Sequence, residues 1–162
     1  MSLKSLVLAP AGSGTVEPRA NGPTTIVFIF SDNIAAADGT IDSNEFTITN
    51  ATFSSASIPA NTLTLNLNGV IDQSVVSVTL NGIQNTSGNP LTGDNDIEIC
   101  ALVGAANQSQ VVDKPDLQGV KDHAGEPLDQ MSGNYLFDLD IDGTIGRGDG
   151  RVIKMNKLHT VP

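Results

Sequence analysis

The residues best suited to chemistry gather in one stretch, residues 138–149, which reads DLDIDGTIGRGD. Aspartates occupy its first, third and fifth positions, a glycine follows at the sixth, and a further aspartate closes it at the twelfth. Alternate side chains of a tightly wound loop converge on one point, and a hard cation takes six to eight oxygen ligands. A glycine at the sixth position allows a sharp turn that a Cβ would strain. The spacing therefore predicts a Ca²⁺-binding loop.

The same layout assigns a role to each position of the loop, as in an EF-hand. The expected ligands are four carboxylates and the backbone carbonyl of the seventh position: Asp138, Asp140, Asp142, Thr144 and Asp149. Asp149 replaces the usual glutamate and is one methylene shorter, so the loop must close more tightly around an ion. The alternative is a solvated acidic turn, since Asp-Gly pairs are common in β-turns.

A weaker copy of this pattern lies 33 positions earlier, at residues 105–116 (AANQSQVVDKPD). Ala105 stands where the leading acid would be, and Gln110 stands where the turn glycine would be. The remaining oxygen donors are few: Asn107, Ser109, the Val111 carbonyl and Asp116. We expect this first copy to bind Ca²⁺ weakly or not at all and to mirror the second copy structurally.

Two short helices are predicted to follow the two loops. Apolar residues recur there at helical spacing: Leu117, Val120 and Ala124 after the first loop, and Val152, Ile153, Met155 and Leu158 after the second. Such stripes predict amphipathic helices of two to three turns. Helices this short are unstable in isolation, so we expect them to pack on each other.

The preceding residues, 3–102, show the period of two that is typical of β-strands. The run 24–31 (TTIVFIFS) is apolar on both faces, which suits a central strand. Later runs place apolar residues at alternate positions: Leu63, Leu65 and Leu67; Val76, Val78 and Leu80; Ile97, Ile99 and Ala101. Turn-forming clusters separate these runs. The pattern predicts a mainly β chain: an antiparallel β-sandwich at 3–102, then a small helical module at 103–162.

Composition excludes several function classes. Eight Lys and Arg residues against 18 Asp and Glu give a net charge of −10, which argues against nucleic acid and against an anionic membrane surface. No run of 18 apolar residues is present, so no membrane span is predicted. Cys100 is the only cysteine; it cannot form an intrachain disulfide, and we expect it to be a small core residue.

Residue patterns for catalysis are weak. Histidines are confined to His123 and His159, no serine lies in a nucleophile-elbow pattern, and the acids have metal spacing rather than that of a glycosidase pair. We expect no enzymatic activity. Carbohydrate binding by the β-sandwich is an alternative, although the chain offers no Trp, one Tyr and five Phe for an aromatic platform.

Paired calcium-loop–helix repeats, with aspartate at each twelfth position and no helix before the first loop, resemble a dockerin domain. The resemblance covers roughly residues 103–159 and is strong for the second repeat and partial for the first. Residues 75–93 (VVSVTLNGIQNTSGNPLTG) resemble the last strands of bacterial immunoglobulin-like modules. Together these resemblances imply an immunoglobulin-like β-sandwich followed by dockerin-like, EF-hand-like (F-hand) loop–helix motifs.

The resemblance implies a non-catalytic attachment module. Dockerins bind cohesin modules in a Ca²⁺-dependent way and attach enzymes, often polysaccharide-degrading ones, to scaffolds or cell surfaces. We therefore expect a piece of a larger secreted or cell-surface bacterial protein. No signal peptide is evident, and the initial Met-Ser-Leu looks like a cloning leader.

Recognition of cohesin in this family involves the tenth and eleventh loop positions, often a Ser/Thr pair. Here these positions are Lys114 and Pro115 in the first loop and Arg147 and Gly148 in the second. Neither pair matches the family pattern, and the two pairs differ from each other. The alternative partner is the chain's own β-sandwich neighbour, in which case the module is a structural terminus of a larger extracellular enzyme.

Overall fold

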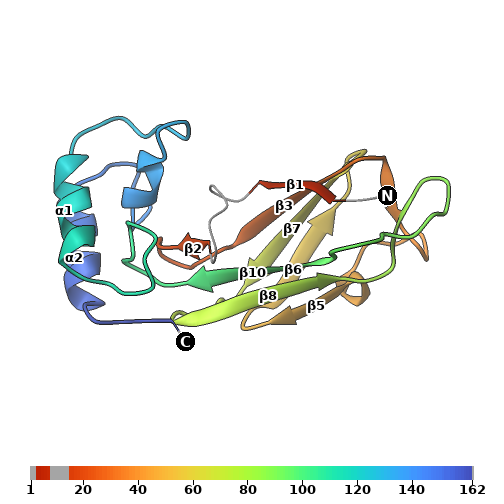
Figure 1. The fold of residues 1–162 in the computed structure, drawn as a ribbon, viewed down its shortest axis with the longest axis horizontal. Helices are drawn as coiled ribbons and strands as arrows, with labels where there is room; N and C mark the ends of the chain where they lie inside the picture. Colours follow the sequence, from red (N-terminus) through yellow and green to blue (C-terminus); the bar gives the residue numbers. More distant parts are fainter. Residues whose placement is uncertain (1–2, 8–14, 162) are drawn as a thin grey trace. The chain divides into compact units, whose positions relative to one another are not determined.

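The computed structural model describes residues 3–7 and 15–161, with side chains from residue 15 onward (Figure 1). This part of the chain is mainly β, with strands in three sheets, two α-helices and two short 3-10 helices. The strands are β1 (Leu3–Val7), β2 (Val16–Glu17), β3 (Thr25–Phe30), β4 (Ile34–Ala36), β5 (Phe46–Thr49), β6 (Thr52–Ser57), β7 (Thr62–Asn68), β8 (Ser74–Leu80), β9 (Ile83–Asn85) and β10 (Asp96–Ala101). The helices are η1 (Ser43–Glu45), α1 (Lys114–Asp122), η2 (Asn134–Phe137) and α2 (Arg147–Met155).

The chain forms two compact units. Unit 1 comprises the described residues of 1–11, 23–70 and 76–98, and unit 2 comprises those of 12–22, 71–75 and 99–162. The sequence predicts a single boundary between residues 102 and 103. Instead, the end of β10 and two segments distant in sequence belong with the helices, because the helical part draws part of its apolar core from them.

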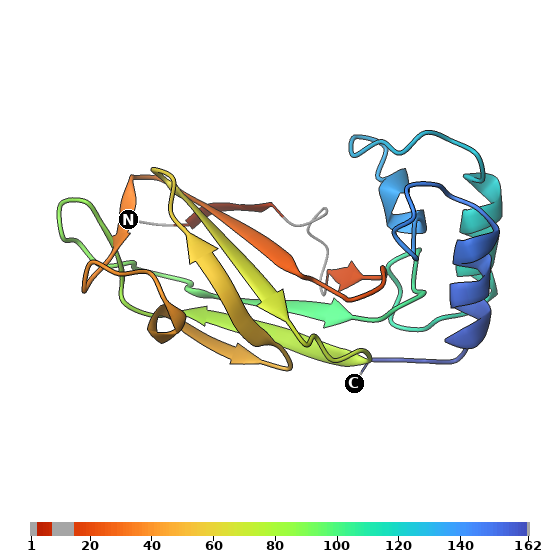
Figure 2. The ribbon, with the colours of Figure 1, turned by 180° about the vertical axis from the view of Figure 1, so that it is seen from behind.

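In unit 1, one sheet has the strand order β1-β3-β7-β6, with antiparallel neighbours (Figure 2). As predicted, the run 24–31 contains an internal strand, β3. Alternate residues of β3 and β7 are fully buried: Ile26, Phe28, Phe30, Leu63, Leu65 and Leu67. The period of two predicted for β7 is therefore confirmed. In β3, whose run is apolar on both faces, one face is fully buried and Val27 and Ile29 on the other are half-buried. These buried side chains give unit 1 much of its core.

A second sheet has the order β2-β10-β8-β5, and β4 and β9 form a separate antiparallel ribbon. Strand β8 buries Val76, Val78 and Leu80, as its alternation predicts. Strand β10 departs in two ways from a simple antiparallel strand with alternate burial. Its pairing with β2 is parallel rather than antiparallel. Its last three residues, 99–101, are all buried, because Cys100 on the opposite face packs into the core of unit 2.

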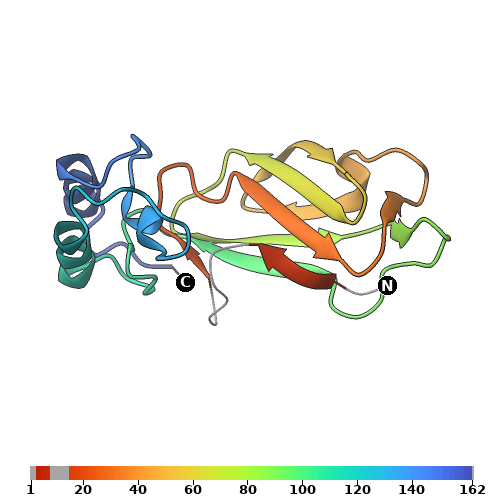
Figure 3. The ribbon, with the colours of Figure 1, turned by 90° about the horizontal axis from the view of Figure 1, so that it is seen from above.

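Unit 2 is built around α1 and α2, which pack on each other as predicted (Figure 3). Its core consists of small and branched side chains from the loops, the helices, β2 and β10: Val16, Cys100, Leu102, Ala105, Ala106, Val112, Val120, Leu139, Ile145, Ile153 and Val161. Cys100 is thus the buried core residue that the sequence predicts. The expected stripe of α2 is wrong at its end, since Met155 is 82% exposed and Leu158, beyond the helix, is 72% exposed.

The described helices include none with the length and apolar character needed to cross a membrane.

The connection that follows α1 is tied back onto that helix. The Phe137 ring stacks with the His123 ring at a centroid distance of 4.5 Å, and it lies against Gly119. The buried Asn134 side chain accepts a hydrogen bond from the Asp129 amide at 2.7 Å. A Cβ at Gly119 would overlap Cε1 of Phe137, so glycine leaves the room that this ring occupies.

We predict that Gly119→Ala lowers the free energy of unfolding. Inside a helix, alanine is ordinarily favoured over glycine by about 1 kcal/mol. Here the added methyl forces the Phe137 ring from its place, and overpacking costs about 1–3 kcal/mol. Thermal and urea denaturation in the presence of Ca²⁺ measure the net change. In a Phe137→Leu background the same substitution should cost less or become stabilising; stabilisation in the wild-type background would refute the packing.

Candidate metal centre

The second predicted loop folds around three carboxylates. Asp138, Asp140 and Asp149 each offer an oxygen, and these three oxygens lie within 4.8 Å of one another. Ca²⁺ binds oxygens at about 2.3–2.6 Å, so two ligands of one ion are at most about 5 Å apart. The spacing is therefore compatible with a single shared ion. Asp138 and Asp149 are buried and Asp140 is exposed, which leaves the group accessible from the Asp140 side.

Asp138 organises the first half of the loop through backbone hydrogen bonds. Its Oδ1 accepts from the Asp142 amide at 3.1 Å, and its Oδ2 accepts from the Gly143 amide at 3.2 Å. Gly143 has a φ of 88°, a left-handed conformation that glycine adopts without steric cost. The turn predicted at the sixth position is therefore present.

Asp149 closes the loop. Its Oδ1 accepts from the Leu139 amide at 2.6 Å and from the Asp140 amide at 3.3 Å, and its Oδ2 accepts from the Gly146 amide at 2.6 Å. Asp149 is the third residue of α2, where a negative charge interacts favourably with the helix N-terminus. One carboxylate thus joins both ends of the loop to the helix that follows.

The structure brings together three of the four predicted carboxylates. Asp142 lies outside the group, because its Oδ1 accepts hydrogen bonds from the Thr144 amide at 2.8 Å and from Thr144 Oγ1 at 2.7 Å. These local hydrogen bonds compete with an orientation in which the Asp142 carboxylate would point toward the other three. The role of the Thr144 carbonyl as a ligand stays a prediction.

The electrostatics of the group favour a cation. Burial raises the pKa of Asp138, and the negative charge of Asp149 raises it further, while amide hydrogen bonds from Gly143 and Asp142 lower it. Partial desolvation of its carboxyl group, together with the charges of Asp149 and Asp142, also raises the pKa of Asp140, although the residue as a whole is exposed. Keeping such clustered carboxylates ionised costs free energy. A bound divalent cation would offset both the cost of burying their charge and the repulsion between them.

The first loop is closed in the same way, by an aspartate at its twelfth position that accepts hydrogen bonds from backbone amides. Oδ1 of Asp116 accepts from the Asn107 amide at 3.0 Å, and Oδ2 accepts from the Asp113 amide at 2.8 Å. These donors are 33 positions before the Asp140 and Gly146 amides that bond Asp149. Asp116 is fully buried, and this burial raises its pKa.

The oxygen donors predicted for the first loop are engaged within the loop itself. The Ser109 amide donates to Asn107 Oδ1 at 2.9 Å, and Ser109 Oγ donates to the Val111 carbonyl at 2.8 Å. Among the described residues, the one group of three potential metal ligands lies in the second loop. Weak or absent binding by the first loop stays a prediction, and the internal hydrogen bonds supply a physical reason for it.

Backbone geometry establishes the 33-residue repeat. The helices α1 and α2 have nine residues each and begin 33 positions apart. The fourth loop residues, Gln108 and Ile141, share a φ of 61°, and the residues that follow the helices, Gly125 and Leu158, have φ values of 81° and 71°. The two copies therefore share one backbone course, although few of their side chains agree.

Backbone hydrogen bonds also link the two copies to each other. The Gly125 amide, after α1, donates to the Ile145 carbonyl of the second loop at 3.0 Å. The Leu158 amide, after α2, donates to the Val112 carbonyl of the first loop at 2.9 Å. Val112 and Ile145 occupy the eighth position of their loops and are buried. Each loop therefore supports the end of the other copy's helix.

The four predicted recognition residues have different surroundings. Lys114, Pro115 and Arg147 are exposed at the helix starts. Gly148 instead lies against the three carboxylates of Asp138, Asp140 and Asp149, called the metal group below; a Cβ at Gly148 would overlap Oδ2 of Asp140. This role for Gly148 was missed in the sequence, although the glycine-rich run 146–150 could have suggested a close approach.

No protein-family model and no curated protein sequence matches the chain. Among solved structures, the chain is similar to the crystal structure of the N-terminal part of the bacterial S-layer protein SbsC. The TM-score is 0.42 and the sequence identity 16%, over 61% of this chain and 23% of that one. The chain thus spans less than a quarter of that structure's length. Similarity at this level assigns no family.

We predict that Gly148→Ala weakens Ca²⁺ binding by about tenfold, the lower end of the effects expected for groups that orient metal ligands. The added methyl displaces the Asp140 carboxylate from the group. Gly146→Ala is the matched control, since a Cβ there meets no atom within 4 Å. Calorimetric titration of chelator-treated protein compares the two variants, and equal affinities would contradict the assigned contact.

Proposed function

We propose that the chain is a non-catalytic attachment region in which unit 2 folds around one Ca²⁺ ion and presents a protein-binding face. The observation that carries this proposal is the group formed by Asp138, Asp140 and Asp149 within 4.8 Å, held by backbone amides at the start of α2. An ion in this group would join the loop to the helix without any further structural element.

In this proposal Ca²⁺ acts as a component of the fold. Leu139, between two of the ligands, is fully buried, and its carbonyl accepts a hydrogen bond from the Ala20 amide at 2.7 Å. Neutralising the carboxylates on either side would therefore stabilise the packing of the loop against residues near β2. An ion that binds only the folded loop adds its binding free energy to the stability of unit 2.

We further propose that unit 2 is a dockerin-like pair of EF-hand-like loop–helix motifs and that unit 1 is an immunoglobulin-like β-sandwich. The 33-residue repeat and the reciprocal hydrogen bonds between its copies support the first assignment. The antiparallel sheet with alternate buried residues supports the second. The corresponding partner is a cohesin-type module or the chain's own β-sandwich neighbour, in a secreted or cell-surface bacterial protein.

Carbohydrate binding finds no support in the aromatic residues. Such a function ordinarily needs an exposed ring, and none of the six Phe and Tyr side chains is exposed. Phe53 stacks with Phe46 at 5.6 Å, and the Tyr135 ring lies beneath the Arg19 guanidinium at 5.1 Å. We therefore retain protein attachment, and the role of structural terminus remains its alternative.

The proposal predicts one Ca²⁺ site that depends on Asp138. Asp138→Asn removes one charged ligand and should weaken binding by roughly a hundredfold, with loss of the rise in melting temperature that Ca²⁺ produces in the wild type. Calorimetric titration and thermal melts of chelator-treated protein measure both effects.

The matched control is Asp122→Asn, an equal charge change at an exposed residue of α1 outside the loops. It should bind Ca²⁺ as the wild type does. Full affinity in Asp138→Asn would refute the ligand assignment, and two equal sites would show that the first loop also binds.

A further inference from the structure

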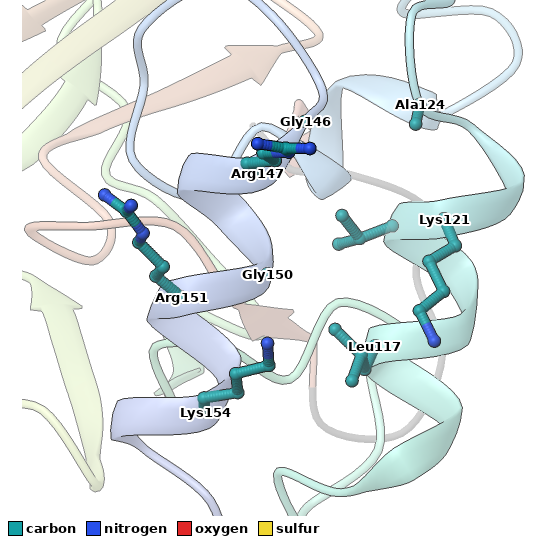
Figure 4. Close-up of a pocket in the computed structure, with 9 residues that line it drawn as sticks. Leu117, Lys121, Ala124, Gly146, Arg147, Gly150, Arg151 and Lys154 are labelled. Atoms are coloured by element: carbon teal, nitrogen blue, oxygen red, sulfur yellow. The ribbon is translucent and has the colours of Figure 1, made fainter.

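A groove of about 390 Å³ lies between α1 and α2 (Figure 4). Its apolar lining comes from Leu117, Val120 and Ala124 on the α1 side, and Gly146 and Gly150 lie on the α2 side. Neither glycine has a side chain to fill the space: a Cβ at Gly146 would meet no atom within 4 Å, and a Cβ at Gly150 would lie 3.5 Å from Cδ1 of Leu117. The three apolar side chains take no part in the group formed by Asp138, Asp140 and Asp149.

Four cationic side chains also line the groove: Lys121, Arg147, Arg151 and Lys154 (Figure 4). All four are exposed, and none makes an ion pair with an acidic residue in the part of the chain that the structure describes. Asp149, between Arg147 and Arg151, is buried and hydrogen-bonded within its loop. Asp122, next to Lys121, is exposed and accepts a hydrogen bond from the Gln118 side chain at 2.7 Å.

This arrangement contrasts with the rest of the chain. The protein carries a net charge of −10 with only eight Lys and Arg residues, and half of these line one groove. Segregated charge of this kind attracts and orients a partner of opposite charge. The groove therefore combines apolar contact area with unpaired positive charge.

We infer that this groove docks an acidic polypeptide segment of a protein partner, with an apolar side chain between the helices and carboxylates at the surrounding cations. The inference rests on the proposed function, since it specifies the protein-binding face of unit 2. A membrane surface fits less well, because the apolar residues line a concavity instead of protruding. Nucleic acid fits less well, because the chain is acidic and no aromatic ring lines the groove.

The groove also favours one orientation of its occupant. Three of the four cations come from the α2 repeat, and one comes from α1. At equivalent positions of the repeat, Arg151 corresponds to Gln118, and Gly150 corresponds to Leu117. If the two copies were exchanged, a cation would replace an amide at one position and a leucine would replace a glycine at the other. A segment seated in one direction does not fit equally well in the reverse direction.

The test uses the full chain, labelled with ¹⁵N and loaded with Ca²⁺, and a synthetic peptide of alternating Glu and Leu. We expect saturable chemical-shift changes at the amides of Gly146 and Gly150, with an affinity that falls roughly tenfold as salt rises from about 0.05 to 0.5 M. Two control peptides of equal length replace Glu by Gln or Leu by Ser, and both should bind at least several-fold more weakly.

The variants separate the groove from the fold. The double variant Arg151→Gln and Lys154→Gln should weaken peptide binding by about tenfold, and Gly150→Leu should block it by filling the space opposite Leu117. Lys157→Gln, a cation outside the groove lining, should bind the peptide as the wild type does. A Ca²⁺ titration and a thermal melt accompany each variant, so loss of the fold is recognised.

Four outcomes would overturn the inference: equal binding of either control peptide, chemical-shift changes only at residues that do not line the groove, shifts that grow with protein concentration without peptide, or preference for phosphatidylglycerol vesicles. The third would identify a second copy of the chain as the occupant, and the fourth a membrane. Normal Ca²⁺ binding without peptide binding would refute the groove alone, whereas absence of Ca²⁺ binding would refute the proposed function.

Discussion

The interaction on which unit 2 depends is the buried carboxylate that closes each loop. Asp149 accepts three backbone amide hydrogen bonds, and Asp116 accepts two at equivalent positions. A buried carboxylate without such donors would cost several kcal/mol, so each loop must adopt the course that supplies them. Because both aspartates are third residues of their helices, the same hydrogen bonds determine where α1 and α2 begin. The same hydrogen bonds therefore determine both the shape of each loop and the position of the helix that follows it.

The two copies satisfy this constraint and then diverge in chemistry. At the first loop position, one copy places Asp138, which bonds two amides and joins the metal group, and the other places Ala105, which is fully buried in the apolar core. The methyl group of Ala105 contributes to the apolar packing of the core, whereas the carboxylate of Asp138 contributes negative charge to the loop. The first loop then engages its remaining oxygens internally, as Ser109 does with Val111. A duplicated backbone thus carries one copy with an apolar first position and one copy with a group of three carboxylates.

Local patterns in the sequence predicted the local features of the structure. The strands β3, β7 and β8, both helices and the loop at 138–149 follow from periodicity and spacing, because each depends on residues close in sequence. Other features depend on distant residues. Asp72 accepts a hydrogen bond from the Val103 amide at 2.8 Å, and β2 adds Val16 to the core of unit 2. Nothing in the local pattern of 15–22 or 71–75 marks these segments as part of that core. The turn from Asp142 to Thr144 and the space at Gly148 likewise depend on three-dimensional packing.

The metal group and the groove are connected through α2. A nine-residue helix is not stable alone, and α2 is held at its start by Asp149 and beyond its end by the hydrogen bond from Leu158 to Val112. Arg151 and Lys154 lie between these two supports, on the exposed side of a helix whose Ile153 is buried. An ion in the second loop would strengthen the first support and so restrict the positions that these cations can take. Charge that is held in place discriminates among partners better than charge on a mobile segment, because less conformational entropy is lost on binding. Calcium would in this way contribute to recognition without contacting the partner.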